Sequence, residues 1–332
     1  MTRPVAEQSV VVLGASSGIG RATALRFARR GAAVTCAARS EPDLQSLVAE
    51  ISAGGGRAQA VPTDAVDAAA VQRLADRAEE RYGRIDTWVN AAAVSVWGKV
   101  EDITSEEFDR VLQVNVLGHV HGAQAALPAL RRAGGGVIIG ISSVEGVRAV
   151  PLHAPYTASK MALRGFYDCL RMELAAEGSP VAVTTILPAS IDTPFFEHAR
   201  SKLGGHLPQP PPPVYSADVV AAAIVRAAQR PTREVPVGGS AIGFFLGQRL
   251  NPALTDAVMS WRGVQRAALE SDHVDDGRDN LDAPMPGTGR VGGAFPPARV
   301  LQSSAFTALL GSAPRPGELV GAVAARLRRP GA

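Results

Sequence analysis

The sequence predicts an α/β fold in which a doubly wound parallel sheet of about seven strands carries helices on both faces. The first observation is an alternation of strand-like and helix-like segments from Ser9 to Val237. Such alternation implies crossover connections, which bring successive strands into parallel register. The second observation is that runs such as Val137–Ile141 are almost continuously apolar. Strands covered on both faces have this composition.

The individual elements follow from local composition. Short β-branched and apolar runs predict strands at Ser9–Leu13, Ala33–Ala38, Ala58–Pro62, Ile85–Asn90, Gly136–Ile141, Val181–Leu187 and Glu234–Val237. Apolar residues at helical spacing predict helices at Gly18–Arg30, Leu44–Ile51, Ala68–Arg81, Phe108–Leu130, Ala158–Ala176 and Ala217–Gln229. The prolines of Leu207–Val214 predict an extended segment before the last of these helices.

Composition divides the chain into three parts. Residues 1–240 are expected to form the alternating domain, and residues 241–269 a helical extension. Residues 270–332 lose periodicity and become acidic and rich in Pro and Gly, which predicts a solvated, partly disordered tail with one short helix at Leu319–Leu327. The apolar segment Ala241–Leu246 is too short to cross a bilayer, although an anchor lying in the membrane interface is one alternative.

Charge and cysteine content exclude several classes of protein. The formal net charge of +3 is too small for a nucleic-acid-binding surface, so we expect no nucleic-acid partner. Cys36 and Cys169 have no metal-ligand spacing and suit reduced thiols, which favours a cytoplasmic location. His119 and His121 lie two apart on a predicted helix and point to different faces, so we expect a site without metal.

A glycine-rich turn joins the first strand to the first helix. Gly14, Gly18 and Gly20 enclose Ser16, Ser17 and Ile19 in the pattern GxxxGxG. Glycine allows a sharp turn and a close approach of the backbone to a phosphate. The free N–H groups and the positive end of the helix dipole then face that phosphate. The strand–turn–helix context predicts a dinucleotide site here.

The end of the second strand indicates which dinucleotide binds. An acidic residue that holds a ribose 2′-hydroxyl is expected about 20 residues after the turn. Ala38 and Arg39 occupy this position, and no carboxylate occurs until Glu41. Because a guanidinium bonds a phosphate with two N–H groups, we expect NADP(H) rather than NAD(H). The alternative is that Arg39 is one more surface arginine in an arginine-rich chain.

Tyr156 and Lys160 form the candidate catalytic pair. Their spacing of four places both on one helical face, and lysine occurs only three times in the chain. A nearby ammonium favours the phenolate form of tyrosine, whose ordinary pKa is about 10. Ser143 follows a strand at the carboxyl end of the sheet, where its hydroxyl can stabilise an oxygen that gains charge. Asn115 lies in the preceding long helix.

These motifs together resemble the short-chain dehydrogenase/reductase family, in its single-domain branch. The resemblance covers roughly Ser9 to Val237 and implies a Rossmann-like fold. Asn115, Ser143, Tyr156 and Lys160 match the catalytic tetrad of the family. The matching cofactor-site residues are Gly14, Gly18, Gly20, Asp64, Asn90, Ala91, Pro188 and Thr193.

The resemblance implies a role for each matching residue. Asp64 is expected to bond the adenine, and Asn90 and Ala91 to lie near the adenosine ribose. Lys160 is expected to hold the nicotinamide ribose and to lower the pKa of Tyr156. Asn115 is expected to place a water in a proton relay, while Pro188 and Thr193 line the nicotinamide side.

The sequence departs from the family pattern at three places. Leu13 stands where a threonine often precedes the first glycine, Ala93 replaces a common glycine, and Ala189 replaces the glycine of a common Pro-Gly. The added methyl groups are expected to narrow the cleft without removing a reacting group.

The resulting prediction is an NADP(H)-dependent oxidoreductase that moves hydride between nicotinamide and a carbonyl or alcohol. One alternative is a non-catalytic protein that senses dinucleotides on the same fold, although such a protein does not need an intact tetrad. Another is an epimerase or dehydratase of the extended branch, whose GxxGxxG spacing this turn lacks.

The segments expected to enclose the substrate are largely apolar. They are Val94–Trp97, Val144–Pro155 and Ile191–His206, which contribute Val96, Trp97, Leu152, Phe195 and Phe196. We therefore expect a mid-sized apolar ketone, aldehyde or secondary alcohol, with Leu203–Pro213 as a lid. The resemblance implies a homodimer or homotetramer formed through the two longest helices.

Overall fold

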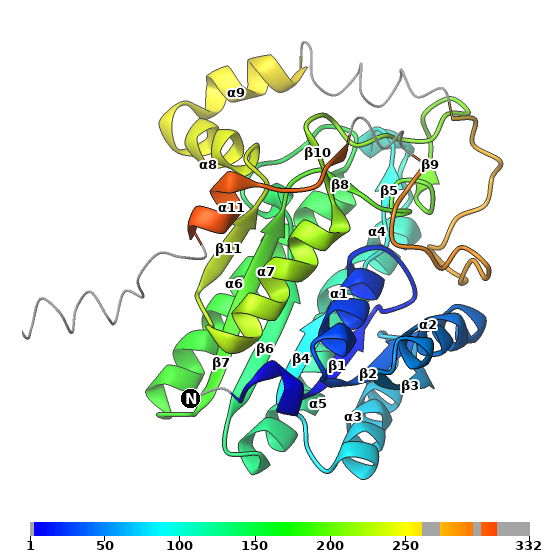
Figure 1. Cartoon of the computed structure of the whole chain (residues 1–332). Coiled ribbons are helices and arrows are strands. Elements are labelled where there is room, and N and C mark those ends of the chain that lie inside the picture. Colours follow the sequence, from blue (N-terminus) through cyan, green and yellow to red (C-terminus); the bar gives the residue numbers. More distant parts are fainter. Residues whose placement is uncertain (1–2, 261–272, 295–299, 311–332) are drawn as a thin grey trace, which may run out of the picture.

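A seven-stranded parallel sheet forms the centre of the computed structural model, which describes residues 3–260, 273–294 and 300–310 (Figure 1). The strand order is β11-β7-β6-β4-β1-β2-β3, and neighbouring strands run parallel. This confirms the predicted fold class and strand number. The strands are β1 (Ser9–Leu13), β2 (Ala33–Ala38), β3 (Arg57–Pro62), β4 (Thr87–Asn90), β6 (Gly136–Ile141), β7 (Val181–Pro188) and β11 (Glu234–Val237).

Helices cover both faces of this sheet, as Figure 1 shows. Successive strand residues point to opposite faces, so Val10 and Val12 pack in one hydrophobic cluster, and Val11 and Leu13 in the other. The first cluster is closed by α1 (Gly18–Arg29), α2 (Glu41–Ala53) and α7 (Ala217–Gln229). The second is closed by α3 (Ala68–Tyr82), α5 (Gly118–Arg132) and α6 (Ala154–Ala176).

The topology sets the position of the binding cleft. β1 lies between β2 and β4, so the chain winds outward in both directions from this pair of strands. In sheets of this kind, ligands bind beyond the carboxyl ends of the strands where the direction of winding changes. Gly14 follows β1 and Ala91 follows β4, so both lie at this edge.

The predicted helix Phe108–Leu130 is helical throughout, and a π-helical turn divides it into two α-helices. The chain forms α4 (Ser105–Leu112), a π-helical turn η3 (Gln113–Leu117) and then α5. The N–H of Gly118 donates to the carbonyl of Gln113, five residues earlier, which accommodates one extra residue per turn. Such π turns occur often at functional sites, and this one carries Asn115.

Short elements complete the fold. The strands β5 (Val96–Trp97) and β9 (Arg200–Ser201) pair with each other, and β10 (Val214–Ser216) pairs with β8 (Ile191–Asp192) and β12 (Val300–Leu301). The single-turn helices are η1 (Val5–Glu7), η2 (Val100–Asp102) and η4 (Val144–Gly146), and α11 (Ala305–Leu310) packs near β11. No helix forms in the proline-rich segment 207–213, as expected.

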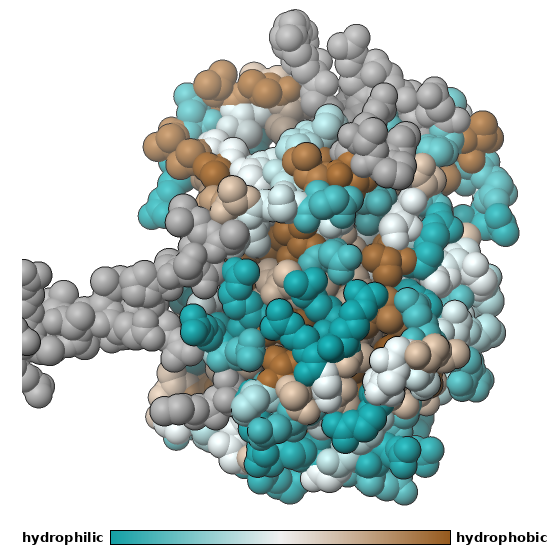
Figure 2. All heavy atoms as spheres, in the orientation of Figure 1, coloured by the Kyte–Doolittle hydropathy of each residue, from teal (hydrophilic) through white to brown (hydrophobic). Residues whose placement is uncertain are grey.

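The chain continues as α8 (Ala241–Leu250) and α9 (Pro252–Val258). Figure 2 shows hydrophobic residues gathered over these two helices, at one end of the molecule. They include the exposed side chains of Leu246, Leu250 and Leu254. Among the described residues, no helix is both long and apolar enough to cross a membrane. The helix expected at Leu319–Leu327 lies outside the described residues.

Candidate active site

The glycine turn between β1 and α1 forms one end of the cleft. Gly14 has a φ of +96°, and a Cβ there would lie 2.4 Å from the backbone nitrogen of Ala92. A Cβ on Gly20 would lie 1.9 Å from the carbonyl oxygen of Gly14. Both contacts are far closer than packed atoms allow. The glycines therefore let the turn fold tightly onto itself and onto the chain after β4.

The amino end of α1 opens into the same cavity. Ser16, Ser17, Gly18 and Ile19 line it, and Ser17 at the N-cap makes no capping hydrogen bond with its side chain. The first N–H groups of a helix have no partners within the helix and carry partial positive charge. The positive charge of this helix end fits the pyrophosphate of a dinucleotide.

The adenosine end of the cleft contains Arg39 and Asp64, which both line the cavity. The guanidinium of Arg39 donates hydrogen bonds to the carbonyls of Asn280, Leu281 and Asp282. One carboxylate oxygen of Asp64 accepts the N–H of Val66 at 3.2 Å. Both predicted residues thus reach the cleft, and Arg39 is held there by a distant part of the chain.

The last residue of β4, Asn90, and the next residue, Ala91, have different surroundings. Ala91 lines the cavity. The fully buried side chain of Asn90 instead accepts the indole N–H of Trp88 at 2.8 Å and donates to the hydroxyl of Tyr167 at 3.0 Å. Asn90 therefore joins the end of β4 to buried side chains outside the cavity. Its expected position near the ribose stays a prediction.

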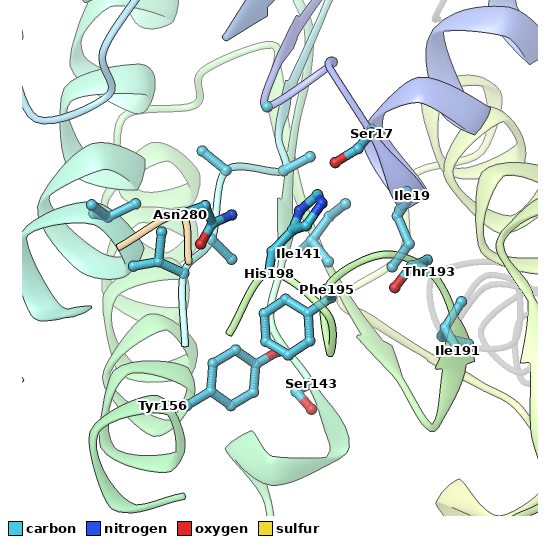
Figure 3. Close-up of a pocket in the computed structure, with 18 of the residues that line it drawn as sticks. Ser17, Ile19, Ile141, Ser143, Tyr156, Ile191, Thr193, Phe195, His198 and Asn280 are labelled. Atoms are coloured by element: carbon cyan, nitrogen blue, oxygen red, sulfur yellow. The ribbon is translucent and has the colours of Figure 1, made fainter. Parts of the chain in front are cut away.

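Tyr156, Lys160 and Ser143 meet at the other end of the cavity. Tyr156 and Lys160 lie in the first turns of α6, and Ser143 follows β6. Figure 3 shows Tyr156 and Ser143 in the cavity. The ammonium of Lys160 lies 5.2 Å from the ring centre of Tyr156 and donates to the carbonyl of Ile141 at 3.0 Å. The hydroxyl of Ser143 accepts the N–H of Glu145 at 3.1 Å. The predicted phenol, ammonium and hydroxyl therefore share one cavity.

Burial dominates the protonation of this group. It raises the pKa of Tyr156, and the charge of Glu145 raises it further, while a hydrogen bond with Ser143 acts in the opposite direction. Burial also lowers the pKa of Lys160 to about 7, against the opposing effect of Glu145. The ammonium of Lys160 was expected to lower the pKa of Tyr156, but the largest cause of the shift is burial of the phenol, which raises it.

The side chain of Asn115 makes hydrogen bonds to neighbouring groups of the protein. It accepts the N–H of Val94 at 2.8 Å, and it donates to the carbonyl of Val94 and to the hydroxyl of Ser159, each at 3.0 Å. Asn115 is fully buried and does not line the cavity. It joins the loop after β4 to α6, so its described contacts are structural. Its relay role stays a prediction.

His153 is a site residue that the sequence prediction did not include. Its ring stacks between Trp97 and Tyr156, at centroid distances of 3.8 and 4.4 Å. Nδ1 lies 3.1 Å from the carboxylate of Glu145, and Nε2 lies 2.5 Å from the hydroxyl of Ser95. The ring thereby fixes the plane of Tyr156. The sequence signals for it are its place in the predicted wall segment Val144–Pro155 and its position three residues before the tyrosine.

Aromatic side chains form the wall beside Tyr156. Trp97, Phe195 and Phe196 line the cavity as predicted, and Phe195 lies 5.2 Å from the ring centre of Tyr156. Pro188 and Thr193 also line it. Two predicted wall residues, Val96 and Leu152, do not line it.

Residues far along the chain complete the wall. The α8 residue Phe244 lines the cavity, as do Pro211 from the expected lid and Asn280 and Met285 from the acidic, Pro/Gly-rich region. Sequence periodicity carried no signal for these positions. We call residues 279–290 the C-terminal strap.

Comparison with known proteins identifies the family. A family model described as short chain dehydrogenase matches residues 8–204, which is more than half of the chain. The chain belongs to this family. The match includes the glycine turn and the segment from Ser143 to Lys160, so the predicted resemblance is confirmed.

Similar proteins agree with this assignment. The short-chain dehydrogenase described here is 39% identical over 254 residues to a Bacillus subtilis protein named uncharacterized oxidoreductase YxnA, over 76% of this chain and 71% of that protein. It is 43% identical over 185 residues to the probable oxidoreductase EphD of Mycobacterium tuberculosis, over 55% of this chain but 31% of that protein.

A solved structure has the same fold. A short-chain dehydrogenase/reductase from Burkholderia phymatum in complex with NAD superposes with a TM-score of 0.66 at 26% identity, over 76% of this chain and 95% of that one. The short-chain dehydrogenase described here is therefore an oxidoreductase that uses a nicotinamide dinucleotide and acts on a small molecule.

Proposed function

We propose that this chain is an NADP(H)-dependent oxidoreductase that transfers hydride between nicotinamide and a mid-sized apolar ketone, aldehyde or secondary alcohol. One observation supports this most strongly. Tyr156, Lys160 and Ser143 line the same cavity as the glycine turn Gly14–Gly20. When bound, the nicotinamide supplies or accepts the hydride, and the chain supplies the proton and the electrostatic stabilisation.

Tyr156 is the proposed proton donor or acceptor. Because burial and the charge of Glu145 raise its pKa, the phenol stays protonated at neutral pH. A protonated phenol is ready to donate to the oxygen of a carbonyl as that oxygen gains negative charge. A protonated phenol can donate to a carbonyl, whereas alcohol oxidation first requires the phenolate.

Ser143 and Lys160 support that step. The hydroxyl of Ser143 is placed to donate a hydrogen bond to the same oxygen, which stabilises charge that develops in a buried site. The ammonium of Lys160 is held by the carbonyl of Ile141 at 3.0 Å. A cation there stabilises the phenolate that remains after proton transfer.

Arg39 is the proposed determinant of cofactor preference. No carboxylate follows β2 before Glu41, so nothing at the strand end itself favours a 2′-hydroxyl. The hydrogen-bond partners of Arg39 are the neutral carbonyls of Asn280, Leu281 and Asp282. A phosphate dianion is a stronger acceptor for a guanidinium than a neutral carbonyl.

The aromatic wall supports an apolar substrate. Trp97, Phe195, Phe196 and Phe244 line the cavity that also contains Tyr156. Aromatic faces offer large apolar contact areas and few hydrogen bonds, which suits a hydrophobic carbonyl compound better than a charged sugar.

Assembly and location are proposed from the surface and the cysteines. Leu117, Met161 and Met172 are exposed apolar side chains on η3 and α6, which supports a homodimer or homotetramer formed there. Cys36 and Cys169 are both free, which supports a cytoplasmic location. Light scattering would measure the oligomer, and a monomer at micromolar concentration would contradict this part.

The test is a screen of ketones, aldehydes and alcohols by nicotinamide absorbance, with NADPH and NADH in parallel. We expect turnover with apolar carbonyls and NADPH. Arg39→Ala should weaken NADPH binding by about tenfold or more and leave NADH binding nearly unchanged. Equal losses for both cofactors would contradict the NADP(H) preference, and binding without any turnover would favour a dinucleotide sensor.

A further inference from the structure

The ring of His198 lies in the cleft without a role in the proposed chemistry. It lines the cavity, and Figure 3 shows it between Asn280 and Ser17 of the glycine turn. The residue is only 6% exposed, and its buried Nε2 finds no hydrogen-bond partner among the described residues. Buried polar nitrogens almost always have a partner, because leaving one without costs free energy. This nitrogen is therefore expected to bond a ligand.

The backbone of His198 is held on both sides. Its N–H donates to the carbonyl of Pro194 at 2.9 Å, and its carbonyl accepts the N–H of Asn280 at 3.0 Å. These two hydrogen bonds fix the backbone of His198 and therefore the position of its ring. Asn280 belongs to the C-terminal strap, so the strap helps to position the imidazole.

The strap itself is bonded along the nucleotide side of the cleft. A carboxylate oxygen of the buried Asp43 accepts the N–H groups of Gly287 at 3.0 Å and Gly289 at 3.1 Å. The N–H of Gly18, in the glycine turn, donates to the carbonyl of Arg290 at 2.9 Å. The strap and the glycine turn therefore enclose one space, and His198 faces into it.

The chemistry of this space favours an anionic oxygen as the partner. The amino end of α1 contributes partial positive charge, and the N–H of Gly18 there already donates to the carbonyl of Arg290. Burial lowers the pKa of His198, so the neutral ring keeps one N–H to donate. The described residues contain no group of three potential ligands for a metal ion. A phosphate oxygen of a dinucleotide satisfies both the helix end and the imidazole.

We propose that His198 donates a hydrogen bond from Nε2 to the pyrophosphate of the bound dinucleotide, and that the strap holds His198 in position for it. This inference rests on the proposed dinucleotide-dependent function. Both NAD(H) and NADP(H) carry the pyrophosphate, whereas only NADP(H) carries the 2′-phosphate assigned to Arg39. His198 lies outside the residues that match the family motifs.

The test compares His198→Ala and His198→Gln with the parent chain by calorimetric titration of NADH, NADPH and ADP. His121→Ala is the matched control, because His121 does not line the cavity. We expect His198→Ala to weaken all three ligands by a similar factor of about ten or more, since one hydrogen bond to a charged group is lost. His198→Gln should retain part of the affinity, because its amide also donates, and His121→Ala should bind as the parent does.

Unchanged binding of NADH and ADP by a folded His198→Ala chain would overturn this contact while leaving the proposed function intact. A loss confined to NADPH would also overturn it, because the ring would then serve the 2′-phosphate. If the parent chain binds neither dinucleotide, the proposed function fails and the contact fails with it. Thermal unfolding without ligand checks that each variant is folded, and His198→Gln keeps the test decisive if the alanine variant is not.

Discussion

Replacing Asn115 with alanine removes three buried hydrogen bonds from the base of the active site. The lost partners are the N–H and carbonyl of Val94 and the hydroxyl of Ser159. Each backbone group left buried and unpaired costs roughly 1–3 kcal/mol. The hydroxyl of Ser159 still donates to the carbonyl of Tyr156 at 2.7 Å, so its loss adds little. We expect the free energy of unfolding to fall by about 3 kcal/mol in total.

Urea denaturation followed by circular dichroism measures this loss. The control is Gln72→Ala, because Gln72 makes an exposed hydrogen bond to Asp76 and its replacement should cost about 0.5 kcal/mol at most. The bonds would not be the main support of the chain around Val94 if Asn115→Ala lowered the free energy of unfolding by less than about 1 kcal/mol. This comparison requires that the dependence of that free energy on urea concentration be unchanged. Activity should fall as well, since Val94 lines the cavity.

Two further predictions concern the proton-transfer group. Ser143→Ala should lower kcat by about a hundredfold while NADPH affinity stays the same, since the hydroxyl acts on charge that develops during the reaction. Steady-state kinetics with a parallel binding titration would measure both quantities. An equal loss of affinity would argue against this role of Ser143. Glu145→Gln removes a negative charge that raises the pKa of Tyr156. The phenolate should then form at lower pH, so the pH profile of alcohol oxidation should move to lower pH, and an unmoved profile would exclude Glu145 as a cause.

Local sequence patterns predicted the parts of the fold that depend on local burial. Ser9–Leu13, Ala33–Ala38 and Gly136–Ile141 form strands at the predicted bounds. These segments are apolar because helices cover both of their faces, so composition alone marks them. The glycine turn was predictable for a similar reason, since the required backbone conformations and close contacts exclude other residues at Gly14 and Gly20.

Features that depend on distant contacts were not predictable in this way. The strap was predicted only as part of a solvated tail from residue 270, because its own composition is polar and aperiodic. Its described residues are placed by partners such as Asp43 and Arg39, more than 200 residues earlier. The orientation of Asn90 is likewise set by Trp88 and Tyr167. Contacts of this kind leave no periodic signal in the sequence.

The central claim is that the phenol oxygen of Tyr156 transfers the proton in a cavity that also holds the dinucleotide. Tyr156→Phe removes this oxygen and keeps the ring that stacks on His153 at 4.4 Å. The decisive measurement titrates NADPH into Tyr156→Phe and then follows NADPH oxidation with a ketone that the parent chain reduces. We predict binding within about twofold of the parent, and a rate lower by about a thousandfold or more. Turnover at the parent rate would contradict the account.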